Sequence, residues 1–235
     1  MRHINLMISV FLVQTTACGE SGNGVLGTEV REVALFSEVE NTGSASLYID
    51  VDPNAPSNSV RLRISGDENL LDEIDTRVAG NTLILDTDDV FHSHNELKVT
   101  ATVPAVGRIA LSGSGDIEAI GMADTELRLT SSGSGDIAAV GDWPLVVLSI
   151  SGSGDVQLSG NVEHLEVSAS GSGRLSARGL SALDADVVNS GSGDVSVCVT
   201  GTLDATTSGS GDVDYYCNPD HVNEASPGSG HVDAH

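Results

Sequence analysis

Aspartate is the residue type that could do chemistry at a regular spacing in this sequence. It follows five copies of a Gly-Ser-Gly motif, and carboxylates stacked at one place in successive turns would repel one another unless something compensates. One interpretation is a calcium site between neighbouring corners, because β-rolls with a shorter glycine–aspartate repeat bind that ion. The alternative is that each carboxylate accepts N–H groups of its own corner, and Arg174, which interrupts the row, favours it. The candidate metal ligands are Asp116, Asp136, Asp155, Asp194 and Asp212.

Other reactive residue types do not form a catalytic pattern. Glycoside-cleaving sites need carboxylates and a base in one groove, whereas the repeat spreads the acids evenly and Lys98 is the only lysine. His92 and His94 could contact a metal ion, although two loop histidines are more often simply polar. We interpret Trp143 as a packing residue. The sequence predicts no catalytic residues and no resident cofactor, with a carbohydrate-active β-helix as the alternative.

The first residues, MRHINLMISVFLVQTTACGES, resemble a bacterial lipoprotein signal. Arg2 supplies a positive charge, an apolar run too short to span a bilayer follows, and Ala17 precedes Cys18. The resemblance implies a signal peptide over residues 1–18 with lipid attached at Cys18, although Thr15 stands where an apolar residue is usual. We expect export to the outer membrane, the periplasm or the cell surface, because Gly19 replaces the Asp that favours inner-membrane retention. An ordinary secreted protein is the alternative.

The remaining two cysteines predict a disulfide. Cys198 and Cys217 lie nineteen residues apart in a chain expected to reach an oxidising compartment. In a solenoid with coils of that length they would lie on neighbouring coils, within reach of a disulfide. Two free thiols are the alternative.

The charge of the chain excludes two classes of partner. Ten Lys and Arg residues face 34 Asp and Glu residues, a net charge of −24. Nucleic acid and anionic lipid headgroups need cations that this chain lacks, so we expect neither as a partner and expect membrane attachment through lipid alone.

The elements that position the aspartates are short strands in a repeat of about nineteen residues. The residue after each aspartate position is aliphatic in every copy, and apolar and polar residues alternate before each corner, which is typical of strands with one buried face. Glycine at the corner would supply positive φ and leave room for the corner stacked above. The seven copies have Asp116, Asp136, Asp155, Arg174, Asp194, Asp212 and His231 in the aligned position.

We therefore predict an all-β fold, a single-stranded parallel β-helix with coils of about nineteen residues and an irregular β-rich N-terminal part. Gly121, Gly141, Gly160 and Gly179 suggest a second corner. The expected organisation is a signal peptide (1–18), a short tether (19–29), irregular N-terminal coils that also cover the open end (30–105), regular repeats (106–217) and a C-terminal cap or tail (218–235).

The combination of RISGDENLLDEIDTRVAGNTLIL at 63–85 with successive SGSGD corners resembles the bacterial domain family described as putative autotransporter adhesin, head domain. This resemblance implies a short parallel β-helix carried by secreted proteins and lipoproteins. A membrane barrel, which an autotransporter needs, is not visible in the chain. We expect a non-catalytic cell-envelope protein, structural or adhesin-like, that binds a surface glycan or protein. A calcium-dependent binding protein is a further alternative.

Overall fold

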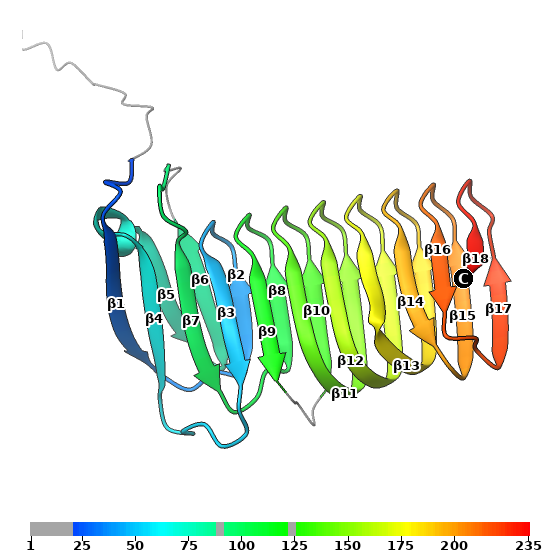
Figure 1. Cartoon of the computed structure of the whole chain (residues 1–235), viewed down its shortest axis with the longest axis horizontal. Helices are drawn as coiled ribbons and strands as arrows, with labels where there is room; N and C mark the ends of the chain where they lie inside the picture. Colours follow the sequence, from blue (N-terminus) through cyan, green and yellow to red (C-terminus); the bar gives the residue numbers. More distant parts are fainter. Residues whose placement is uncertain (1–20, 88–91, 122–125) are drawn as a thin grey trace, which may run out of the picture.

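The structure is a computed structural model, and it describes residues 21–87, 92–121 and 126–235. The described residues form strands and one short 3-10 helix, η1 (Glu68–Glu73), wound into an elongated solenoid (Figure 1). The predicted all-β fold class is confirmed. The strands are β1 (Leu26–Val33), β2 (Glu38–Asn41), β3 (Ser46–Val51), β4 (Val60–Asp67), β5 (Ile74–Ala79), β6 (Thr82–Thr87), β7 (Lys98–Val103), β8 (Arg108–Leu111), β9 (Ile117–Gly121), β10 (Leu127–Ser131), β11 (Ile137–Ile150), β12 (Val156–Ala169), β13 (Leu175–Asn189), β14 (Val195–Val199), β15 (Thr202–Thr207), β16 (Val213–Tyr216), β17 (His221–Ala225) and β18 (Val232–Ala234).

Two parallel ladders form the long sides of the solenoid. The first face contains β6, β2, β8 and β10, then the second halves of β11, β12 and β13, then β15 and β17. The second face contains β7, β3 and β9, then the first halves of the same long strands, then β14, β16 and β18. The Gly-Ser-Gly corners join the two faces and form the row of similar loops along the top of Figure 1.

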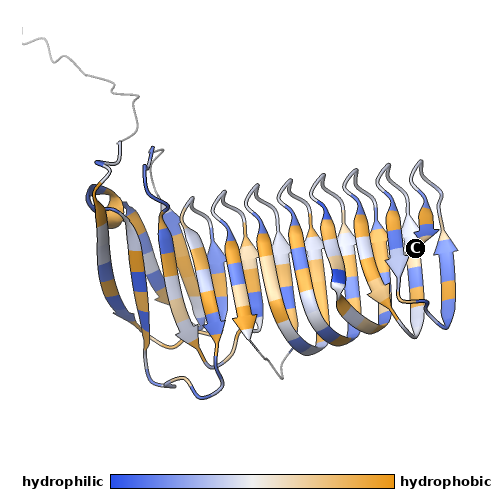
Figure 2. Ribbon diagram, viewed as in Figure 1, coloured by the Kyte–Doolittle hydropathy of each residue, from blue (hydrophilic) through white to orange (hydrophobic). Residues whose placement is uncertain are grey.

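Aliphatic columns fill the space between the two faces. The residues that follow the corners, from Leu47 to Val213, are at most 1% exposed. Val156 pairs with Leu175, and Leu175 pairs with Val195, so matching positions of successive coils lie in register as predicted. Figure 2 shows the resulting alternation of apolar and polar bands along the strands. Burial of each such side chain stabilises the fold by roughly 1.5–3 kcal/mol.

The corner glycines are required by stacking and not by their own backbone angles. A Cβ on Gly154 would lie 1.9 Å from the carbonyl oxygen of Gly135 in the coil below, so a side chain there would force the coils apart. None of the glycines in the described SGSG corners has a left-handed φ, so that part of the prediction is wrong. At the second corner, Gly121 and Gly160 do have positive φ, of 141° and 119°.

The N-terminal part contains a coil that is out of sequence order. Strands β2 and β3 lie between the coil of β6 and β7 and the coil of β8 and β9. Their corner, NTGSAS at 41–46, stacks directly on Gly113 and Gly115, whose added Cβ atoms would meet the carbonyl oxygens of Gly43 and Ala45. It is an additional copy of the repeat, with Ser46 in the aspartate position, and the sequence analysis missed it.

The parallel ladders end in antiparallel strands at the N-terminal end. Strand β4 pairs with β7, β1 pairs with β4, and β5 pairs with β6, all antiparallel. Helix η1 connects β4 to β5, and its Leu70 and Leu71 are buried in the core. At the other end, β17 and β18 extend the two ladders as one more coil. The predicted domain boundaries themselves remain predictions.

Candidate functional site

The aspartates of the repeat bind the backbone of the next coil. Asp116 accepts the N–H of Asp136 (2.8 Å), and Asp136 accepts the N–H of Asp155 (2.7 Å). Asp194 and Asp212 do the same for the two coils that follow them. The expectation that each carboxylate serves its own corner is therefore wrong, because its acceptor oxygen reaches across one coil spacing and links the coils.

The structure brings the predicted metal ligands together only as neighbours in a row. Arg174 separates the two runs of aspartates, donates its backbone N–H to Asp155 (2.8 Å) and places its guanidinium 3.9 Å from the second carboxylate oxygen. Among the described residues, including His92 and His94, no three His, Cys, Asp and Glu side chains are grouped as a metal site. Calcium binding stays a hypothesis, and melting with and without a chelator tests it, because a bound ion raises the midpoint.

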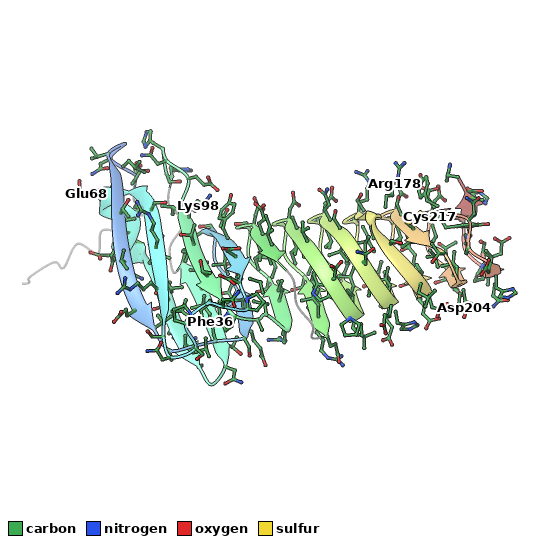
Figure 3. All side chains as sticks on the ribbon, turned by 60° about the horizontal axis from the view of Figure 1, so that its bottom comes forward. Phe36, Glu68, Lys98, Arg178, Asp204 and Cys217 are labelled. Atoms are coloured by element: carbon green, nitrogen blue, oxygen red, sulfur yellow. A yellow bond between two sulfur atoms is a disulfide. The ribbon has the colours of Figure 1, made fainter. Side chains whose placement is uncertain are left out.

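The predicted disulfide between Cys198 and Cys217 is present, with a Cα–Cα distance of 5.2 Å. Cys198 pairs in the ladder with Tyr216, so Cys217 lies one residue beyond the matching position. Cys217 adopts a left-handed φ of 74°, which turns the chain immediately after β16. Figure 3 shows this cysteine and Arg178 towards the C-terminal end. The bond joins two neighbouring coils where the stack ends.

A groove of about 520 Å³ lies on the outside of the second face, where β4 adds to the parallel ladder. Its floor is formed by the short side chains of Thr100 and Thr102 on β7. Arg61 and Arg63 of β4 line one side, and Tyr48 and Asp50 of β3 with Glu118 and Ile120 of β9 line the other. A second groove of about 480 Å³ continues past Tyr48 along Asp116, Asp136 and Asp155.

Tyr48 lies where the two grooves meet. Its hydroxyl donates a hydrogen bond to Glu96 (2.7 Å), and the ammonium of Lys98 lies 3.4 Å from the centre of its ring. Figure 3 shows Lys98 on the outside of the body. The hydrogen bond to Glu96, with burial and nearby carboxylates, raises the pKa of Tyr48 to about 12. The phenol is therefore a fixed, neutral group at physiological pH.

A buried carboxylate holds the N-terminal end together. Asp67 is 0% exposed and accepts hydrogen bonds from the backbone of Gly24, His94 and Asn95, and from the Asn95 amide. Burial alone would raise the pKa of Asp67, but these donors outweigh it, so the pKa lies below its usual value. Asp67 therefore connects the segment before β1 to the loop before β7.

Sequence reasoning did not find the groove. Alternation in VRLRI predicts that Arg61 and Arg63 point outward, but nothing local shows that β4 lies beside β7.

The predicted lipidation site, Cys18, lies outside the described residues. Trp143 is 6% exposed, which agrees with its interpretation as a packing residue. Within the described residues no helix is long and apolar enough to cross a membrane.

The fold and the grooved outer face define the class of protein: a parallel β-solenoid with a ligand-sized groove on one side. The chain belongs to the family described as "Putative auto-transporter adhesin, head GIN domain", which matches residues 35–219. The family resemblance inferred from the sequence is thus confirmed. No curated protein is similar enough in sequence to count as a match.

Solved structures share the whole fold. A "putative adhesin" from Bacteroides fragilis is 24% identical with a TM-score of 0.85, and the alignment covers 92% of this chain and 100% of that one. A "putative lipid binding protein" from Parabacteroides distasonis is 22% identical (TM-score 0.72; 92% and 98% covered). A "putative adhesin" from Parabacteroides merdae is 20% identical (TM-score 0.69; 92% and 98% covered). At these identities the likeness concerns the fold alone.

Proposed function

We propose that the protein is a non-catalytic, adhesin-like binding module that attaches to a surface ligand through the groove between β4 and β3. The observation that carries the proposal is the groove itself, in which an aromatic ring, two arginines and two threonine hydroxyls meet on one outer face. Concave sites with a few convergent polar groups are the usual binding sites of proteins. Membership of an adhesin family supports the same function.

Export and attachment complete the proposal. A lipid at Cys18 would hold the module at the cell envelope and leave the solenoid free to meet a ligand outside the cell. Mass analysis of the protein purified from its host tests this step. The expected mass is that of a chain beginning at Cys18 with acyl groups attached, and an unmodified chain would contradict it.

Catalysis is the second candidate, because Asp50 and Glu118 line the same groove as two arginines. A carbohydrate-active enzyme would use such carboxylates as acid and base. Tyr48, with its raised pKa and its hydroxyl bonded to Glu96, is unsuited to act as a base. Incubation with polysaccharides separates the two functions: we expect no new reducing or unsaturated ends, whereas turnover that Glu118→Gln abolishes would establish an enzyme.

A binding screen against glycan and protein arrays tests the proposed function. Tyr48→Ala should weaken binding of any ligand found by at least ten-fold, because it removes the residue shared by the two grooves. Tyr216→Ala is the matched control, since the Arg178 guanidinium also lies over its ring, 4.1 Å from the centre, on the same face but outside both grooves. Equal loss in both variants, or no loss in Tyr48→Ala, would contradict binding in the groove.

A further inference from the structure

We propose that the ligand of this groove is an acidic saccharide, whose carboxylate is bound by Arg63 together with Arg61. The inference rests on the proposed function and names the chemical class of ligand for the same site. It follows from the shape of the groove, from the state of its two arginines and from the backbone pairing of the strands that form it.

The shape follows from the register of three neighbouring strands. Thr100 of β7 pairs with Arg63 of β4 on one side and with Tyr48 of β3 on the other. Thr102 pairs in turn with Asp50 of β3. Short side chains on the middle strand therefore lie between long ones on both sides. The trough between β4 and β3 spans two strand spacings, roughly 10 Å, which suits a single sugar chain lying along β7.

The arginines are available to an anion. Within the part of the chain that the structure describes, the guanidinium of Arg63 has no ion pair or side-chain hydrogen bond, although its residue lines the groove. Arg61 has one ion pair with another described residue, 3.5 Å to Glu32, and both of those side chains are mostly exposed, so the pair contributes little to stability. Two guanidinium groups spaced along one strand can each offer the planar pair of donors that a carboxylate accepts.

This pair of cations is unusual for such an acidic chain. The protein has only ten Lys and Arg residues against 34 Asp and Glu residues, and Arg61, Arg63 and Lys98 all lie in or beside this groove. At physiological ionic strength, screening limits the range over which the surrounding negative charges repel an anion to about 8 Å. A short chain or a terminal acidic sugar can therefore bind here, whereas a long polyanion would also meet the aspartate row of the second groove.

The backbone of the groove favours a saccharide over an extended peptide. Strands β4, β7 and β3 already pair with one another, so their amides are engaged in the ladder and cannot add another strand. Recognition must come from side chains, and those present are two threonine hydroxyls, the carboxylates of Asp50 on β3 and Glu118 on β9, a tyrosine and two arginines. These groups bind the hydroxyls and the carboxylate of an acidic sugar.

The test compares acidic sugars with neutral forms of the same sugars. Sialyllactose and trigalacturonic acid are each titrated beside their methyl esters against protein purified from cells that express the full chain. We expect the acids to bind at least ten-fold tighter than the esters, and added salt to weaken only the acids. Arg63→Gln should lower the affinity for the acids about ten-fold and remove the preference, because a charged hydrogen-bonding partner is lost.

The controls keep the outcomes separate. Arg77→Gln removes an exposed arginine of β5 outside the groove and should leave binding unchanged, and Arg61→Gln replaces the test variant if Arg63→Gln melts early. If acids and esters bind equally and only Tyr48→Ala weakens them, the acidic-ligand inference is overturned while the proposed function stands. If no saccharide binds, the inference is also overturned, and the protein arm of the array screen then decides the proposed function.

Discussion

The regular coils after residue 108 and the irregular N-terminal part, residues 26–103, are stabilised in different ways. In the regular coils one set of contacts recurs: a corner glycine packed against a carbonyl oxygen of the preceding coil, an aspartate that accepts the N–H of the next coil, and an aliphatic residue in the core. In the N-terminal part the contacts are single, as in the buried Asp67 with its three partner residues. Repetition gives a uniform surface, and the groove with its arginines forms where repetition stops.

The largest effect should come from breaking the repetition at a corner. Gly154→Ala places a methyl group 1.9 Å from the Gly135 carbonyl oxygen, between two backbones that have no room to move without losing ladder hydrogen bonds. We expect a loss of about 3 kcal/mol, or a melting temperature lower by roughly 10 °C. Gly107→Ala, whose added Cβ would approach the Glu126 carbonyl only to 3.5 Å, should change melting little. Equal melting of the two variants would contradict the stacking role.

The repeated part of the fold could be predicted because each coil has the same pattern of apolar and polar residues around its corner. The aliphatic residue after the corner is sufficient to place Val156, Leu175 and Val195 in one column, as observed. The additional copy at 41–46 has the same signals, Leu47 after the corner and Val39 seven residues before Ser46, but its corner has Ala45 and Ser46 where later copies have Gly and Asp. Its neighbour in the stack lies 70 residues further along the chain, which a search for a fixed step cannot find.

Removing the disulfide should loosen the C-terminal end of the regular coils. Cys198→Ser with Cys217→Ser opens a link between two coils nineteen residues apart, worth on the order of 3 kcal/mol in the chain-entropy model. Among the described strands, β17 and β18 pair with the preceding coil alone, so we expect the loss of stability to fall mainly there. Limited proteolysis should cut the variant after β14 while the N-terminal part stays intact. Cleavage first within β1 to β7 would show that the bond stabilises the body as a whole.

Breaking the single contacts of the N-terminal part should have a smaller effect. Asp67→Asn leaves buried backbone donors of Gly24 and His94 poorly satisfied, and we expect a melting temperature lower by roughly 5 °C at pH 7. Asp75→Asn is the matched control, since Asp75 is exposed and its one ion pair within the described part of the chain is with Arg77, at 3.7 Å. Hydrogen exchange should rise in residues 21–24 and 92–95 and not in β11 to β13.

The same residue predicts a pH dependence. The folded pKa of Asp67 lies below its unfolded value, so its stabilisation is complete above about pH 4 and is lost as the pH falls through the folded pKa. The difference in melting temperature between the wild type and Asp67→Asn should therefore be constant from pH 7 to about pH 5 and shrink below pH 4. A difference that grows on acidification would show that the carboxylate is not held ionised.

The groove could not be predicted for a physical reason. Arg61 and Arg63 alternate with buried residues, so the sequence places them on an outer surface, but the partner of an antiparallel strand depends on how η1 returns the chain to β5. In the repeat, by contrast, the neighbour of each residue is known from the spacing. The aspartates, which the sequence made conspicuous, serve mainly to join coils, and the residues best arranged for a ligand carry no repeated signal.

The smallest effects should come from one buried column, where the repeat varies between coils. Asn189 is 0% exposed, donates to the carbonyl of Gly193 (2.9 Å) and accepts the N–H of Gly191 (3.1 Å). Its buried side chain therefore stabilises the Gly-Ser-Gly corner that follows it. Ser131 occupies the matching position three coils nearer the N-terminus, because Ser131 pairs with Ile150, Ile150 with Ala169 and Ala169 with Asn189. Its buried hydroxyl has no hydrogen-bond partner within the described residues.

Substituting each by alanine compares a satisfied polar group with an unsatisfied one at equivalent positions. Asn189→Ala leaves the Gly191 N–H and the Gly193 carbonyl without their partner, and we expect a loss of about 1–2 kcal/mol. Ser131→Ala removes a hydroxyl that is buried without a partner, so we expect a change within about 0.5 kcal/mol, or a slight gain in stability. Chemical denaturation of both variants measures the two free energies of unfolding. A loss in Ser131→Ala as large as that in Asn189→Ala would mean that the column stabilises the coils by filling space, and that the hydrogen bonds of Asn189 add nothing to it.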